Sequence, residues 1–243
     1  MILLSLLFAC LFAVVHLGIG WLTFLGRTPR SRWLSGAGGV AVAYVFLHVL
    51  PELAEHRSIF AEELGTDEGM AEGVVYSLAL IGLVVFYGLE RAIKTSRKRE
   101  MATGQEEAHP AGTFWLHIGS FAAYNVIIGY LLLHREEEGI WSLVIYGIAM
   151  ALHFVTNDFG LRQDHKARYD HVARWILAGA VLGGWALGSF ADLSELSIGF
   201  LFAFLAGGVV LNVLKEELPE ERESRLWPFV GAAAVYAVLL LSI

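Results

Sequence analysis

The chain has 243 residues, of which 56% are hydrophobic and 17% charged, with a formal net charge of −7. Soluble domains are about 45–50% apolar, so this composition excludes an ordinary soluble protein and indicates a membrane protein. The single cysteine, Cys10, excludes an intrachain disulfide. No glycine-rich dinucleotide motif follows a strand pattern, and nothing in the composition supports nucleic-acid binding.

Apolar runs long enough to cross a bilayer recur along the whole chain. A spanning helix needs about 20 mostly apolar residues, and the period-2 alternation of a membrane β-barrel is missing from the sequence. We therefore predict an all-α membrane protein, a single transmembrane domain over residues 1–243. The eight predicted spans are 2–26, 34–54, 72–93, 113–133, 140–160, 171–190, 196–214 and 226–243.

The distribution of lysine and arginine predicts the orientation, because cytoplasmic loops are enriched in both residues. If the loop after the first span is cytoplasmic and the sides alternate, 15 of the 17 basic residues face the cytoplasm, and only Arg57 and Arg135 face outward. This asymmetry predicts an even number of spans in the plasma or inner membrane, with both termini outside.

The outer loops are expected to be acidic. The loop after the second span is predicted to carry Glu52, Glu55, Glu62, Glu63, Asp67, Glu68 and Glu72, and a later outer loop carries Glu136, Glu137 and Glu138. Acidic mouths concentrate cations, but solvated loops of this charge are equally compatible with the pattern.

Two spans share a sequence signature. The second contains Ala-Gly-Gly-Val at 37–40 and ends in Leu-Pro-Glu at 50–52, whereas the seventh contains Ala-Gly-Gly-Val at 206–209 and ends in Leu-Pro-Glu at 218–220. The predicted topology makes these spans antiparallel, so spans 1–3 and 6–8 form a predicted inverted repeat around spans 4 and 5. Inverted repeats are typical of transporters.

Polar residues at membrane depth are costly and therefore informative. Residues four positions apart share one face of a helix, and three spans carry such pairs. These pairs are His48 with Glu52, His153 with Asn157 (followed by Asp158), and Asn212 with Glu216, while Asn125 lies near the middle of the fourth span.

If these helix faces converge, imidazole nitrogens meet oxygen donors inside the bundle. Such a set suits Zn²⁺, and also Fe²⁺ or Mn²⁺, better than soft copper(I). Two other histidines have simpler interpretations: His16 as a helix-packing residue, and His117 as a residue that snorkels or caps near the cytoplasmic end. For Asn125, an interhelical hydrogen bond is an equally good alternative.

Three stretches resemble the ZIP (Zrt-/Irt-like) family of metal transporters. Residues 124–129 (YNVIIG) are in register with the family's His-Asn-x-x-Asp-Gly pattern, and residues 153–160 (HFVTNDFG) with its His-Glu-x-Pro-His-Glu-x-Gly pattern. Residues 206–220 are similar to the family's seventh span and place Glu216 at its acidic position, while residues 48–52 are similar to its His-x-x-Pro-Glu ending. The resemblance covers nearly the whole chain and implies an eight-helix carrier of divalent metal.

The chain departs from the family at the ligand positions. Asn125, His153 and Asp158 match family ligands. The other four positions hold Tyr124 for His, Ile128 for Asp, Phe154 for Glu and Asn157 for the second His, and the span 5 proline is replaced by Thr156. The resemblance therefore implies a single, reduced metal site rather than a two-metal centre, and a weaker kink at Thr156.

Transport of a divalent metal into the cytoplasm, zinc above iron or manganese, is the function that these patterns predict, with no enzymatic step. The predicted partners are the metal ion, the lipid bilayer and a second copy of the chain as a homodimer. The predicted site residues are His153, Asn157, Asp158, Asn125, His48, Glu52 and Glu216. The alternatives are a diverged ZIP-fold sensor or scaffold that transports no metal and, less favoured, an intramembrane metallohydrolase that uses His153, Asp158 and His165.

Overall fold

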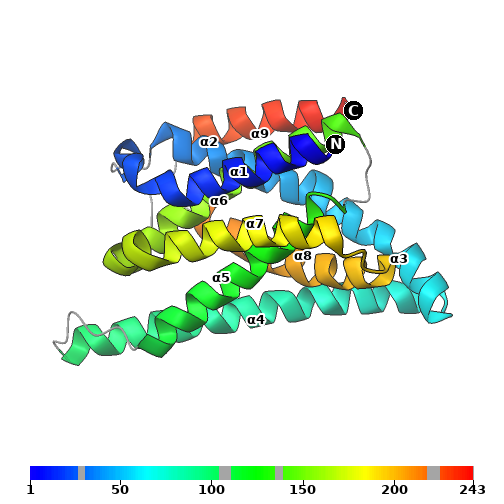
Figure 1. Ribbon diagram of the computed structural model, residues 1–243, viewed down its shortest axis with the longest axis horizontal. Helices are drawn as coiled ribbons and strands as arrows, with labels where there is room; N and C mark the ends of the chain where they lie inside the picture. The colour runs from blue at the N-terminus through cyan, green and yellow to red at the C-terminus, as the bar shows by residue number, and fades with distance from the viewer. Residues whose placement is uncertain (27–30, 104–110, 135–138, 218–224, 243) are drawn as a thin grey trace.

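The computed structural model describes residues 1–243 except 27–30, 104–110, 135–138, 218–224 and 243 (Figure 1). The described residues form helices and no strand. The α-helices are α1 Ile2–Gly18, α2 Arg32–Tyr44, α3 Leu50–Leu64, α4 Glu68–Thr103, α5 Ala111–Leu131, α6 Ile140–Arg168, α7 Arg174–Phe190, α8 Glu195–Glu217 and α9 Leu226–Leu241. Two 3₁₀ turns, η1 Ile19–Trp21 and η2 Thr23–Gly26, follow α1, and two π-helical segments, η3 Val45–Val49 and η4 Tyr169–Ala173, join α2 to α3 and α6 to α7.

Seven helical segments of the described chain are long and apolar enough to span a membrane, and α9 is a shorter apolar helix. The seven segments are Ile2–Trp21, Arg32–Leu64, Glu68–Ala92, Phe114–Leu131, Ile140–Gln163, Tyr169–Phe190 and Glu195–Lys215. The predicted all-α membrane protein is therefore confirmed, with the eighth predicted span shorter than the others.

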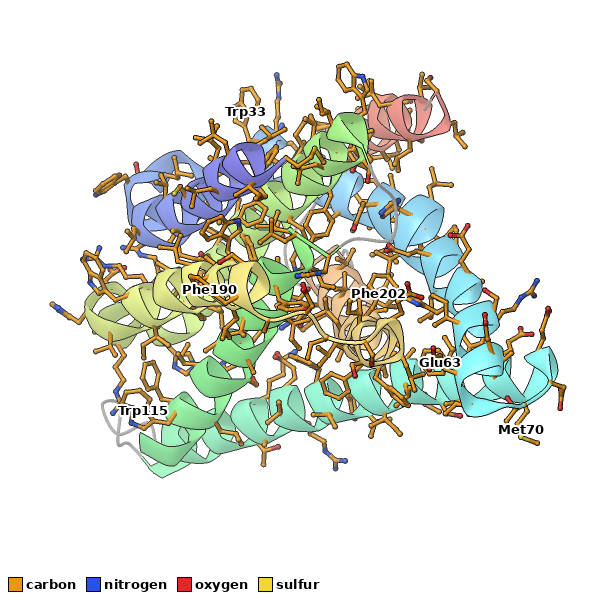
Figure 2. All side chains as sticks on the ribbon, turned by 45° about the vertical axis from the view of Figure 1, so that its right-hand side comes forward. Trp33, Glu63, Met70, Trp115, Phe190 and Phe202 are labelled. Carbon is orange, nitrogen blue, oxygen red and sulfur yellow. The ribbon has the colours of Figure 1, made fainter. Side chains whose placement is uncertain are left out.

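The outer surface of the bundle is apolar. Figure 2 shows Trp33, Trp115 and Phe190 on the outside, where they are 76%, 53% and 89% exposed, whereas Phe202 lies among the helices and is 7% exposed. Water does not tolerate so much contiguous apolar surface, whereas lipid does. The bundle is thus built to bury its polar side chains inward and to present hydrocarbon to the bilayer.

The second span is longer than predicted. The expected span 34–54 is part of one helical segment, Arg32–Leu64, of 33 residues. At 1.5 Å per residue it is about 50 Å long, more than a bilayer core requires. Glu55, Glu62 and Glu63 therefore lie on α3 and not in an outer loop, which corrects the prediction.

Local signals set the ends of this segment. The Ser31 hydroxyl accepts a hydrogen bond from the Leu34 amide (3.1 Å) and caps α2. Gly65 ends α3 in the left-handed conformation (φ 62°), and the Thr66 amide donates to the Ala61 carbonyl (3.0 Å).

Two other helices also extend past their predicted ends. α4 continues to Thr103 rather than stopping at 93, and α6 continues to Arg168 rather than 160. Within α6 the non-helical backbone occurs at His165 and not at Thr156, whose hydroxyl donates to the His153 carbonyl (2.9 Å). The helix is thus intact at Thr156.

Glycines allow three helix pairs to approach closely. A Cβ on Gly207 would lie 1.8 Å from the Ala79 carbonyl oxygen of α4, and one on Gly39 would lie 2.2 Å from the Phe229 carbonyl oxygen of α9. Such backbone contact is the usual role of small residues between membrane helices. The most extensive helix pairs are accordingly α5 with α7, α4 with α8 and α2 with α9.

The two Ala-Gly-Gly-Val segments occupy corresponding places in this packing. The segment of α2 rests on α9, and the segment of α8 rests on α4. Exchange of spans 1–3 with spans 6–8 converts one contact into the other. The inverted repeat itself stays a prediction.

Successive spans run in alternating directions, with α2 and α3 in a single span, and Figure 1 shows both termini at the same end of the bundle. The other end, which we name the basic end, is where α2, α5, α7 and α9 begin and where α1, α4, α6 and α8 finish. The described basic side chains at that end include Arg91, Lys94, Arg168, Arg174 and Lys215.

Candidate functional site

A buried polar network joins α1, α5 and α6 in the interior. His16 Nδ1 lies 2.6 Å from Asp158 Oδ2, and His16 Nε2 lies 2.8 Å from Asn125 Oδ1. All three side chains are fully buried. His16 is 142 positions from Asp158 and 109 from Asn125 in the sequence, so only the tertiary fold brings it to them.

Hydrogen-bond direction constrains the charge of this network. The Asn125 Nδ2 amide donates to the Phe121 carbonyl (2.8 Å), so its Oδ1 faces His16 and must accept a hydrogen bond from His16 Nε2. His16 Nδ1 and Asp158 Oδ2 then share one proton, as imidazolium with carboxylate or as imidazole with carboxylic acid. In either form the pair carries no net charge.

This network changes the interpretation of three residues. Asp158, a predicted metal ligand, is engaged by His16 through one carboxylate oxygen. Asn125 makes the interhelical hydrogen bond that was its alternative role. His16 does pack between helices, as predicted, but as the centre of a polar network.

The His16 main chain and ring are held in place by two aromatic residues. Tyr169, in η4, donates from its hydroxyl to the His16 carbonyl (3.2 Å). The Phe154 ring lies 4.7 Å from the His16 ring, measured between centroids. Phe154 therefore contributes an apolar contact to the His16 ring.

His153 is held by a second, separate contact. Its Nε2 lies 3.2 Å from the Tyr124 hydroxyl. Both residues are buried. Within the described part of the chain, His153 therefore hydrogen-bonds to Tyr124 rather than to Asn125.

Several buried polar atoms near these contacts have no hydrogen-bond partner among the residues that the structure describes. His153 Nδ1 and Asn157 Nδ2 on α6 belong to this group, and so does Asn212 Nδ2 on α8. The two helices pack against each other. Each such atom costs about 1–3 kcal/mol when nothing satisfies it.

His48 and Glu52 form the pair that the sequence predicted. His48 Nε2 lies 3.4 Å from Glu52 Oε2, and the two side chains are 12% and 13% exposed. His48 is in the π-helical segment η3, which ends two residues before Pro51, and the Tyr44 ring lies 4.9 Å from its ring. Proline cannot donate to the preceding turn, and π segments of this kind often occur at functional sites.

Glu216 lies in α8, but its side chain is outside the described residues, so the predicted role cannot be placed.

Three further polar contacts occupy the basic end. Arg162 forms a bidentate pair with Asp170 (2.7 and 2.8 Å), Lys215 Nζ lies 2.9 Å from Glu90 Oε2, and His117 Nδ1 lies 3.1 Å from His165 Nε2. His117 is therefore buried against a histidine partner, and its predicted role as a snorkelling or capping residue is wrong.

The predicted site residues thus form separate groups rather than one cluster. Among the residues that the structure describes, no group of three or more histidine, cysteine, aspartate or glutamate side chains is arranged to hold a metal ion. His153, Asp158 and His165, which the metallohydrolase alternative requires, hydrogen-bond to three different partners. No family, curated protein or solved structure matches this chain.

Proposed function

We propose that this chain carries a divalent metal ion, Zn²⁺ in preference to Fe²⁺ or Mn²⁺, across the plasma or inner membrane into the cytoplasm. The observation that carries the proposal is a set of buried polar atoms on α6 and α8, at His153, Asn157 and Asn212, that have no hydrogen-bond partner among the described residues. Proteins keep such costly groups where a ligand or ordered water satisfies them.

The chemistry of these residues suits a metal ion. Neutral imidazole is a common zinc ligand, and His153 supplies one. A rotation of the Asn157 or Asn212 side-chain amide by 180° replaces its nitrogen with a coordinating oxygen. His48 and Glu52, partly exposed near the middle of the helical segment Arg32–Leu64, supply an entrance with one carboxylate. Glu216, His117 and His165, toward the basic end, then form the exit through which the ion reaches the cytoplasm.

The ligand set favours a single ion held weakly. Ile128 and Phe154 contribute no ligand atoms, and Asp158 is neutralised by His16. A divalent ion in the interior needs compensating charge or several dipoles. Weak binding is compatible with transport, because the ion must also leave.

Zn²⁺ uptake into proteoliposomes that contain the purified chain tests the proposal. We expect uptake in the wild type, a loss of about tenfold or more in His153→Ala, and no change in His171→Ala, whose side chain is exposed in η4. Equal uptake by wild type and His153→Ala, or no metal-dependent signal from folded, inserted protein, overturns the proposal.

A second candidate is a ZIP-like membrane protein that no longer transports metal and acts as a sensor or scaffold. The Tyr124–His153 hydrogen bond favours this candidate, because the phenol saturates one of the two His153 ring nitrogens. In that case His153→Ala does not change Zn²⁺ binding by the wild type, whereas Tyr124→His with Ile128→Asp and Phe154→Glu adds a bound zinc ion. A folded triple variant that gains no zinc ion would indicate an unrelated fold.

A further inference from the structure

Two histidines face each other at the basic end, away from the groups discussed above. His117 comes from the first turns of α5 and His165 from the last turns of α6. His117 Nδ1 and His165 Nε2 are 3.1 Å apart, and the residues are 3% and 5% exposed. Two imidazole nitrogens therefore converge in a nearly dry environment.

The backbone of α6 departs from helical geometry to make this contact. His165 has φ −133° and ψ 38° inside a helix that continues to Arg168. The bidentate Arg162–Asp170 pair links the two sides of this break. The non-helical backbone thus occurs at His165, the residue whose ring contacts α5. The Arg162–Asp170 ion pair connects the chain before this residue to the chain after it.

Aromatic rings fix the orientation of both imidazoles. Phe114 lies edge-on to His165 with ring centroids 5.4 Å apart, and Phe121 lies edge-on to His117 at 5.1 Å. The Arg168 guanidinium lies over the Phe114 ring, 5.4 Å from its centroid. The rings are therefore held in place, which lowers the entropic cost of binding a ligand between them.

We propose that His117 and His165 form a binding site for one divalent transition-metal ion, distinct from the His153 region. Zinc–nitrogen bonds of 2.0–2.1 Å at a tetrahedral angle place two ligand nitrogens about 3.3 Å apart. The observed 3.1 Å between the facing nitrogens is close to this separation. When the ion binds, the proton between the two rings moves to the other nitrogen of the ring that carries it, because both facing nitrogens must be unprotonated to coordinate. Water completes the coordination.

The surroundings determine which ions fit. Two neutral imidazoles suit Zn²⁺, Ni²⁺ or Cu²⁺ and do not suit Mg²⁺ or Ca²⁺, which require oxygen ligands. The ammonium group of Lys215 is paired with Glu90 at 2.9 Å, so its charge is compensated. This site does not depend on the transport proposal.

Zinc titration of the purified full-length chain, without a polyhistidine tag and in competition with a chromophoric chelator, tests the inference. We expect one bound Zn²⁺ to be lost, or weakened about tenfold or more, in His117→Gln and in His165→Gln. The control variant His171→Gln should bind as wild type, because its side chain is exposed on η4. His153→Ala should retain this ion, which separates failure here from failure of the transport proposal.

A second measurement needs no variant and therefore cannot be confused by misfolding. Pulsed electron paramagnetic resonance of the Cu²⁺-loaded wild type should show two coordinated imidazoles. Unchanged zinc stoichiometry and affinity in both folded variants overturns the proposal, as does a copper spectrum without two imidazole ligands. Competition by excess Mg²⁺ would also contradict it.

Discussion

His16 and Asp158 form a fully buried hydrogen-bonded pair, and the energetics of such pairs are asymmetric. Forming a buried pair stabilises little, because both groups lose their hydration. Removing one partner is costly, because the other is left uncompensated. The pair therefore explains how α1 is positioned against α6, rather than why the bundle is stable overall.

We predict that His16→Leu lowers the free energy of unfolding by about 3–5 kcal/mol, measured by SDS titration in mixed micelles. The double variant His16→Leu/Asp158→Leu should recover part of this loss, since no charge then remains buried. His171→Leu serves as the exposed control. If His16→Leu unfolds like wild type, the pair does not have the role assigned to it.

The Tyr124 hydroxyl competes with any ion for His153 Nε2. We predict that Tyr124→Phe costs about 1 kcal/mol in unfolding free energy and increases Zn²⁺ binding by the full-length chain. Tyr76→Phe, which changes an exposed tyrosine on α4, is the matched control. A decrease in Zn²⁺ binding in Tyr124→Phe would instead indicate that the Tyr124 hydroxyl is itself a zinc ligand.

Individual residues differ in how well the sequence identified them. Asn125, His153 and Asp158 are conspicuous because they interrupt long apolar runs, and each has a polar contact in the interior. His16 was underestimated because nothing near it in the sequence is polar. Its partner Asp158 is 142 positions away, and one sequence contains no signal for such a pairing.

Among the helices, contact between backbones is the principal interaction. In α7, Gly184 and Gly183 are neighbours with opposite surroundings. A Cβ on Gly184 would lie 2.1 Å from the Val126 carbonyl oxygen of α5, whereas a Cβ on Gly183 would meet nothing within 4 Å. A methyl group at position 184 would therefore clash with α5, whereas a methyl group at position 183 has room.

We predict that Gly184→Ala destabilises the protein by about 1–3 kcal/mol through overpacking of α5 against α7. Gly183→Ala should be neutral or slightly stabilising, because alanine is the better helix former. Thermal unfolding in detergent, followed by tryptophan fluorescence, compares the two. Equal melting temperatures for both variants would contradict the close approach of these helices.

Hydropathy locates the helices better than it locates their ends. α3 and α6 run past the predicted boundaries through charged residues, because the backbone continues its hydrogen bonding outside the hydrocarbon core. The shared Ala-Gly-Gly-Val signature did indicate which faces pack closely, since Gly39 and Gly207 both touch a neighbouring backbone.

For the whole molecule, the alternation of helices places the basic loops at one end and both termini at the other. The positive-inside rule then predicts termini outside the cell. Epitope tags at both ends should be accessible to membrane-impermeant antibodies on intact cells or spheroplasts, with a tag inserted directly after Thr103, where α4 ends, as the control. Accessibility only after permeabilisation would invert the orientation and the direction of transport.

The sequence alone determined that this chain is a helical membrane protein, how its loops are charged, and which polar residues lie at membrane depth. These features follow from local composition, because hydrocarbon accepts only apolar, internally hydrogen-bonded segments. The tertiary structure alone decided which polar residues meet: His16 with Asp158 and Asn125, Tyr124 with His153, and His117 with His165. Those contacts depend on the rotation and crossing of helices that are distant in sequence, which local patterns do not specify.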